Sequence, residues 1–239
     1  FQLCNLKIGY NPDFILTRKS DRIVKGDLTK ILPVVKGEQK EMSSQRIPET
    51  SIIRETIHVG GFLVAIACAY LFNRYAIALL ISLVTGLYIV SEIRRMLGAG
   101  LPIIRDITLK AAERSEFEEF VSSPIFYALG IIMPLIIFPE PIGYVSLTVL
   151  TLGDGFATIV GERYGRRHVP FNKVKTLEGS LCGLLPAFMG SLLFITPLRA
   201  LVASLSGMIA EILPLPLNDN LTIPLVSGLA LIGVTWIFL

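Results

Sequence analysis

The sequence holds an aspartate, Asp154, inside an apolar run that covers residues 141–160. An ionised carboxylate near lipid costs roughly 3 kcal/mol on insertion scales, so such a residue usually has a function. The flanking Gly153 and Gly155 allow a ligand or a neighbouring helix to approach the backbone closely. Two interpretations follow. Either Asp154 pairs with a buried lysine or arginine between packed helices, or it binds magnesium, which takes carboxylate oxygens and leaves positions for phosphate.

A second polar element opens the next apolar run and reads Lys175-Thr176-Leu177-Glu178-Gly179-Ser180. We expect a helix to begin here, and a helix N-terminus offers free N–H groups and a positive dipole end to a phosphate. Lys175 can meet the phosphate as a point charge. Glu178 can share a cation with Asp154. The element therefore indicates a phosphate site beside the aspartate.

A short basic loop joins the two elements and carries Arg166, Arg167 and Lys173. Taken alone, these charges are explained by attraction to lipid head groups or by membrane topology. Their place directly before the expected phosphate site favours a second interpretation, in which they attract a nucleotide.

Two further polar elements lie at the heads of apolar runs. Asp219 and Asn220 precede the last run, where such a pair is most often an N-cap and alternatively a metal or ribose contact. Arg54 and His58 are four residues apart and so share a helix face. A histidine at a membrane edge is usually interfacial, and the alternative for His58 is a catalytic or substrate-orienting role.

The composition indicates that these residues belong to a membrane protein. Of the 239 residues, 52% are hydrophobic and 17% are charged, with a mean hydropathy of +0.65. Soluble domains average about 25% charged residues. Spanning backbone must satisfy its hydrogen bonds internally, which favours helices. We therefore predict an all-α fold, a polytopic integral membrane helical bundle with about seven transmembrane helices: 57–72, 75–90, 124–138, 141–160, 180–196, 198–213 and 221–239.

The basic residues fall on one side of this bundle. Seven spans place the segments 1–56, 91–123, 161–179 and 214–220 on one face, which then holds 20 of the 22 lysines and arginines. Only Arg74 and Arg199 lie towards the other face. The positive-inside rule makes the basic face cytoplasmic, so all the polar elements described above meet there.

The chain divides into two parts. Residues 1–52 form a polar segment that we expect to be a cytoplasmic tail, and residues 53–239 form the transmembrane domain. Within that domain, residues 91–123 have the pattern of an amphipathic helix on the membrane surface.

The polar motifs resemble those of the group formed by dolichol kinases, phytol kinases and CTP-dependent diacylglycerol kinases, most closely the dolichol kinases. The resemblance covers roughly residues 52–239. It rests on three ordered motifs and two glycines: Gly153-Asp154-Gly155-Phe156-Ala157, Gly161, Gly165, Lys175-Thr176-Leu177-Glu178-Gly179-Ser180 and Asp219-Asn220-Leu221-Thr222-Ile223-Pro224.

The resemblance implies a CTP-dependent kinase that phosphorylates a polyisoprenoid alcohol at the cytoplasmic membrane face, as in dolichyl phosphate biosynthesis, with Mg²⁺ as cofactor. It implies Asp154, Lys175 and His58 as catalytic residues and Asp154 with Glu178 as metal ligands. The residues expected to bind the nucleotide are Gly153, Arg166, Arg167, Lys173, Lys175, Thr176, Gly179, Asp219 and Asn220.

Other functions stay open at this point. A phytol or diacylglycerol kinase has the same chemistry, a lipid cytidylyltransferase would release pyrophosphate instead, and a small transporter could use Asp154 as a cation site. The chain has no P-loop and no protein-kinase signature. We expect a multi-pass membrane protein, of the plasma membrane in a prokaryote or the endoplasmic reticulum in a eukaryote, with lipid and CTP as partners and no nucleic acid.

Overall fold

A computed structural model describes residues 49–97 and 120–237, with side chains from residue 54 to residue 236. Most of the predicted N-terminal segment, and residues 98–119 of the predicted amphipathic helix, lie outside these ranges. Residues 47–239 form one unit of the chain, which contains the helical bundle.

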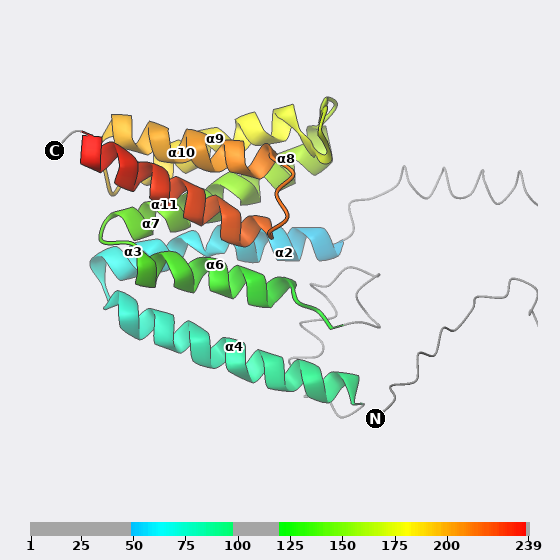
Figure 1. Cartoon of the computed structure of the whole chain (residues 1–239). Coiled ribbons are helices and arrows are strands. Elements are labelled where there is room, and N and C mark those ends of the chain that lie inside the picture. Colours follow the sequence, from blue (N-terminus) through cyan, green and yellow to red (C-terminus); the bar gives the residue numbers. More distant parts are fainter. Residues whose placement is uncertain (1–48, 98–119, 238–239) are drawn as a thin grey trace, which may run out of the picture. The chain divides into compact units, whose positions relative to one another are not determined.

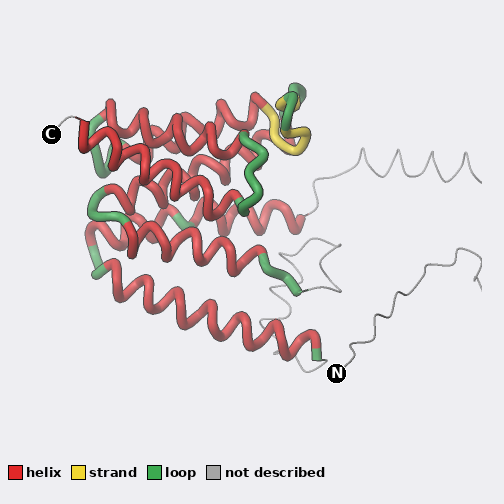
Figure 2. Tube along the Cα trace, in the orientation of Figure 1, coloured by secondary structure: helices red, strands yellow, loops and turns green. Residues whose placement is uncertain are grey.

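Helices make up most of the described chain (Figure 2). Each of the seven predicted apolar runs coincides with one helix or with helices that follow one another directly, so the prediction of a helical fold is confirmed. The helices are α2 (Glu49–Gly60), α3 (Phe62–Tyr70), α4 (Arg74–Met96), α6 (Ser123–Ile137), α7 (Ile142–Thr148), η3 (Val149–Asp154), α8 (Gly155–Tyr164), α9 (Leu177–Ser191), α10 (Pro197–Ile212) and α11 (Asp219–Ile237).

Among the described residues, three stretches of helix are long and apolar enough to cross a membrane: Arg74–Met96, Ile142–Tyr164 and Asp219–Trp236. This supports a membrane bundle. The crossing of all seven predicted spans stays a prediction.

The continuous helix α7–η3–α8 forms the centre of the bundle. Its residues Val145, Val149 and Leu150 are fully buried in one hydrophobic cluster with side chains of α9, α10 and α11. By contrast, α4 packs mainly against α6 and leaves most of its apolar side chains exposed (Figure 1). The central helix is thus shielded on several sides, while α4 offers an apolar face suited to lipid.

A short hairpin is an addition to the predicted all-α fold. Strands β1 (His168–Val169) and β2 (Asn172–Thr176) pair antiparallel within the basic loop, with His168 opposite Thr176. The hairpin, the N-termini of α2, α9 and α11, and the C-terminus of α8 all lie at one end of the bundle (Figure 1). This arrangement brings the polar elements of the sequence to a common face.

Two local features mark that end of the bundle. The turn of π-helix η3 ends at Asp154, and such turns are frequent at functional sites. In α9, a Cβ on Gly183 would collide with the carbonyl oxygen of Gly153, and a Cβ on Gly179 would meet that of Ala157 at 2.5 Å. The glycines therefore permit a contact that larger residues would prevent.

Candidate active site

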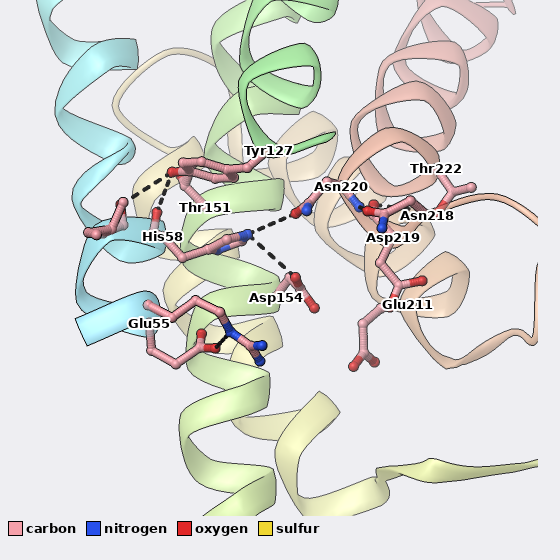
Figure 3. Close-up of polar contacts among 12 residues, drawn as sticks. Glu55, His58, Tyr127, Thr151, Asp154, Glu211, Asn218, Asp219, Asn220 and Thr222 are labelled. Carbon is pink, nitrogen blue, oxygen red and sulfur yellow. Dashed lines mark hydrogen bonds and ion pairs between the residues drawn. The ribbon is translucent and has the colours of Figure 1, made fainter. Parts of the chain in front are cut away.

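Asp154 contacts a lysine through one carboxylate oxygen and faces a histidine through the other. Its Oδ1 is 3.2 Å from Lys175 Nζ, and its Oδ2 is 3.6 Å from His58 Nε2. Figure 3 shows His58 on one side of the aspartate, and Glu211 and Asp219 on the other. The residue is 9% exposed. One carboxylate thus links a lysine that reaches it from β2 to a histidine on α2.

Lys175 is surrounded by carboxylates. Besides Asp154, its Nζ is 3.0 Å from Glu211 Oε1 and 2.9 Å from Asp219 Oδ2. Burial alone would lower the pKa of Lys175, but the three carboxylates hold that pKa well above its usual range. Three carboxylates and one ammonium leave a formal charge of −2. The cluster therefore attracts a cation, most strongly a divalent one.

His58 is held in place by its neighbours on α6 and α11. Its Nε2 is 3.0 Å from Asn220 Oδ1, and its ring lies 4.5 Å from that of Tyr127. The hydroxyl of Tyr127 donates to the backbone carbonyl of His58 at 2.8 Å (Figure 3). Gly61 lies so close to this hydroxyl that a Cβ there would collide with it. The imidazole is therefore fixed with one nitrogen facing Asp154.

Glu178 binds the hairpin backbone. Its Oε2 accepts the N–H groups of Arg166 at 3.2 Å and Arg167 at 3.1 Å, and these bonds hold the pKa of Glu178 below its usual range. The hydroxyl of Thr176 caps α9 by accepting the N–H of Gly179 at 3.2 Å. The sharing of a cation by Glu178 and Asp154 stays a prediction.

The other predicted nucleotide-binding residues surround this cluster. The side chains of Arg166, Arg167 and Lys173 are exposed on the hairpin. Gly153 is buried where α9 and α10 approach the central helix, within reach of Ala187 and Met208. The structure thus brings together Asp154, Lys175, His58, Asp219 and Asn220, with the hairpin charges at the margin.

Sequence reasoning missed Glu211 and Tyr127. Glu211 is 2% exposed, and its Oε2 accepts a hydrogen bond from Ser180 Oγ at 2.7 Å. The signal that could have found it is the one that singled out Asp154, a carboxylate near the end of an apolar run. Tyr127 gave no such signal, because tyrosines are common at membrane interfaces.

The carboxylates around Lys175 meet some of the requirements of a magnesium site. Within the described residues, no group of three or more acidic, histidine or cysteine side chains is arranged to hold a metal ion. The carboxylates converge on the lysine instead. Magnesium, however, is usually bound through one or two carboxylates, with phosphate and water completing its shell. Asp154 and Asp219 could supply that number.

Comparison with known proteins gives the family. Farnesol kinase of Arabidopsis thaliana is 34% identical over 211 residues, which cover 80% of this chain and 67% of that one. A probable phytol kinase of Zea mays is 27% identical, with shares of 79% and 68%, and phytol kinase 1 of Arabidopsis thaliana is 26% identical, with shares of 80% and 69%. All three are chloroplastic proteins.

No family model and no solved structure matches the chain. The likeness to these enzymes extends over about two thirds of their length. The chain belongs to the family of the farnesol and phytol kinases. The predicted enzyme class, a kinase with an alcohol as acceptor, is thereby confirmed.

Proposed function

We propose that the protein transfers the γ-phosphate of CTP to a prenyl-type alcohol at the surface of a membrane. One observation carries the proposal: Asp154 contacts Lys175 through one oxygen and faces His58 through the other. A kinase must hold a phosphate and a hydroxyl next to each other. The lysine suits the first and the histidine suits the second.

The nucleotide would bind on the side of Lys175. Phosphoryl transfer passes through a loose transition state, so positioning and charge neutralisation do most of the work. Lys175 would neutralise phosphate oxygens, and the basic hairpin would attract the triphosphate. Asp154 and Asp219 would hold Mg²⁺, which neutralises charge on the phosphates when bound. The formal charge of −2 in the cluster supports a divalent ion.

The alcohol would bind on the side of His58. Its hydroxyl would lie near Nε2, while its tail stays among lipid chains between the helices. Asp154 would accept the hydroxyl proton; His58 could accept it at Nε2 only after that nitrogen has given up its own proton, which now faces Asn220 Oδ1. Tyr127 supports the placement of His58 beside the hydroxyl, because its own hydroxyl and ring fix the histidine backbone and imidazole.

Two classes of acceptor alcohol are proposed. A prenyl alcohol of the farnesol or phytol type is favoured by the names of the relatives. A longer, dolichol-type polyisoprenoid is the second candidate, favoured by Glu178 in the motif that resembles dolichol kinases. The sites proposed for phosphate and hydroxyl are the same in both cases.

A transfer assay tests the proposal. Purified protein in lipid nanodiscs would be given labelled CTP, Mg²⁺ and, separately, farnesol, phytol, dolichol and diacylglycerol. We expect a lipid phosphate and CDP, loss of activity on chelation of Mg²⁺, and lower activity with ATP. A CDP-lipid with pyrophosphate would indicate a cytidylyltransferase, and absence of transfer to every acceptor would refute the kinase.

The site assignment needs a matched pair of variants. Lys175→Ala should abolish transfer, because the phosphate loses its counter-charge. Arg94→Ala removes a basic residue that is exposed on α4, away from the cluster, and should leave transfer unchanged. Equal activity in the two variants would contradict the assignment.

A further inference from the structure

We propose that Glu211 is a positioning residue of the kinase reaction, which holds the Lys175 ammonium beside Asp154 while the nucleotide is bound. This inference rests on the proposed function. It assigns to Glu211 a role that neither the sequence motifs nor the relatives suggest.

The contacts of Glu211 distinguish it from the other two carboxylates. Its Oε1 lies 3.0 Å from Lys175 Nζ, and its Oε2 accepts the hydroxyl of Ser180 at 2.7 Å. Both oxygens therefore have a partner inside the protein, and one partner is a side chain of the helix that follows the lysine. Glu211 cannot turn away without leaving a buried carboxylate unsatisfied, which is strongly unfavourable.

Asp219 and Asp154 are freer to change partners. The side chain of Asp219 is 35% exposed and begins α11, where water or a cation can reach it. Asp154 divides its oxygens between Lys175 and His58. A bound cation with its phosphates would engage these two carboxylates. Glu211 would then remain as the carboxylate that holds the lysine.

The contact between Glu211 and Lys175 matters because a lysine side chain is flexible. Its ammonium stands on a four-carbon stem with many rotamers, and it binds phosphate as a point charge without directional preference. A shift of about 1 Å in a group at the reacting centre can reduce the rate about 100-fold. Glu211 holds the ammonium through a buried carboxylate, so that the position of the ammonium does not depend on the nucleotide alone.

The test compares three variants with wild-type protein in nanodiscs, with CTP, Mg²⁺ and the alcohol that the wild type uses best. Glu211→Gln keeps the shape and the hydrogen bond to Ser180 but removes the charge that holds Lys175. Ser180→Ala keeps that charge and removes only its anchor. Ser204→Ala is the control. This serine is buried on α10, the helix that carries Glu211, and its hydroxyl has no hydrogen-bond partner in the described structure.

We expect Glu211→Gln to lower kcat by about 100-fold while the KM for the alcohol stays near its wild-type value. The protein should stay folded, because Lys175 keeps Asp154 and Asp219 as partners. Ser180→Ala should lower kcat in the same direction by a smaller factor, and Ser204→Ala should change neither constant. A merely structural glutamate would affect the melting temperature and spare kcat in the folded fraction.

The outcomes separate the two proposals. If the wild type is active and Glu211→Gln is folded with an unchanged kcat, the role of Glu211 is refuted and the kinase stands. If Glu211→Gln does not fold, Ser180→Ala decides in the same way, a lower kcat supporting the role and an unchanged kcat refuting it. If the wild type phosphorylates no alcohol, the proposed function fails, and with it the inference that rests on it.

Discussion

Replacing Lys175 by methionine should destabilise the protein through the carboxylates that it leaves behind. The wild-type cluster carries a formal charge of −2, and the variant carries −3. Glu211 and Asp154 are 2% and 9% exposed, so water cannot compensate for the lost ammonium. Removing one partner of a buried ion pair typically costs about 3–5 kcal/mol. For a chain of this size that corresponds to a drop of about 6–20 °C in melting temperature.

The double variant Lys175→Met, Glu211→Gln separates stability from catalysis. It returns the cluster to −2 and neutralises the most deeply buried of the three carboxylates. We expect it to recover part of the lost stability, because the more deeply buried carboxylate is neutral while Asp154 still lacks its ammonium. We expect no recovery of phosphoryl transfer, because the phosphate still lacks its ammonium.

The assay is thermal unfolding of the three proteins in one detergent, followed by circular dichroism, together with transfer from labelled CTP. A Lys175→Met protein as stable as the wild type would refute the charge argument. A double variant no more stable than the single one would refute it as well. Transfer restored in the double variant would contradict the role of the lysine.

Two further predictions concern the hairpin and the helix contact beside it. Because the pKa of Glu178 is lowered, its carboxylate should stabilise the hairpin above about pH 4.5 and lose that effect as the pH falls through the lowered value. Protection of the Arg166 and Arg167 amides from hydrogen exchange should therefore fall on acidification. A Glu178→Ala protein that keeps full protection at neutral pH would contradict this. Gly179→Ala should lower the free energy of unfolding by about 1–3 kcal/mol, because the new Cβ meets the backbone of α8. A Cβ at Gly86 meets no atom within 4 Å, so Gly86→Ala should not destabilise the protein. Equal melting temperatures of the two variants would refute the close contact.

The sequence was sufficient for much of the fold and part of the site. Apolar runs separated by polar loops predict helices directly, because membrane backbone has few alternatives. The bias of basic residues placed the heads of several helices on one face. The sequence therefore predicts that Asp154, Lys175 and His58 lie at the same end of the bundle. The position of Asp219 near them followed from the same reasoning.

The remaining features depend on packing that residue types alone do not specify. Glu211 meets Lys175 only because α10 packs against the start of α9, so its contact could not be predicted even though its place in an apolar run was visible. Glu178 was expected beside a cation shared with Asp154. In the structure a short hairpin returns two backbone N–H groups to it, and the loop sequence has no strand alternation that would predict this hairpin.

The most direct test of the central claim is the transfer of labelled phosphate to farnesol, phytol and dolichol by wild-type protein and by Asp154→Asn. The substitution keeps the shape of the side chain and removes the carboxylate between Lys175 and His58. We predict prenyl phosphate from the wild type and at least about 100-fold less from the variant, with the variant still folded. Undiminished transfer by a folded Asp154→Asn protein would contradict the account.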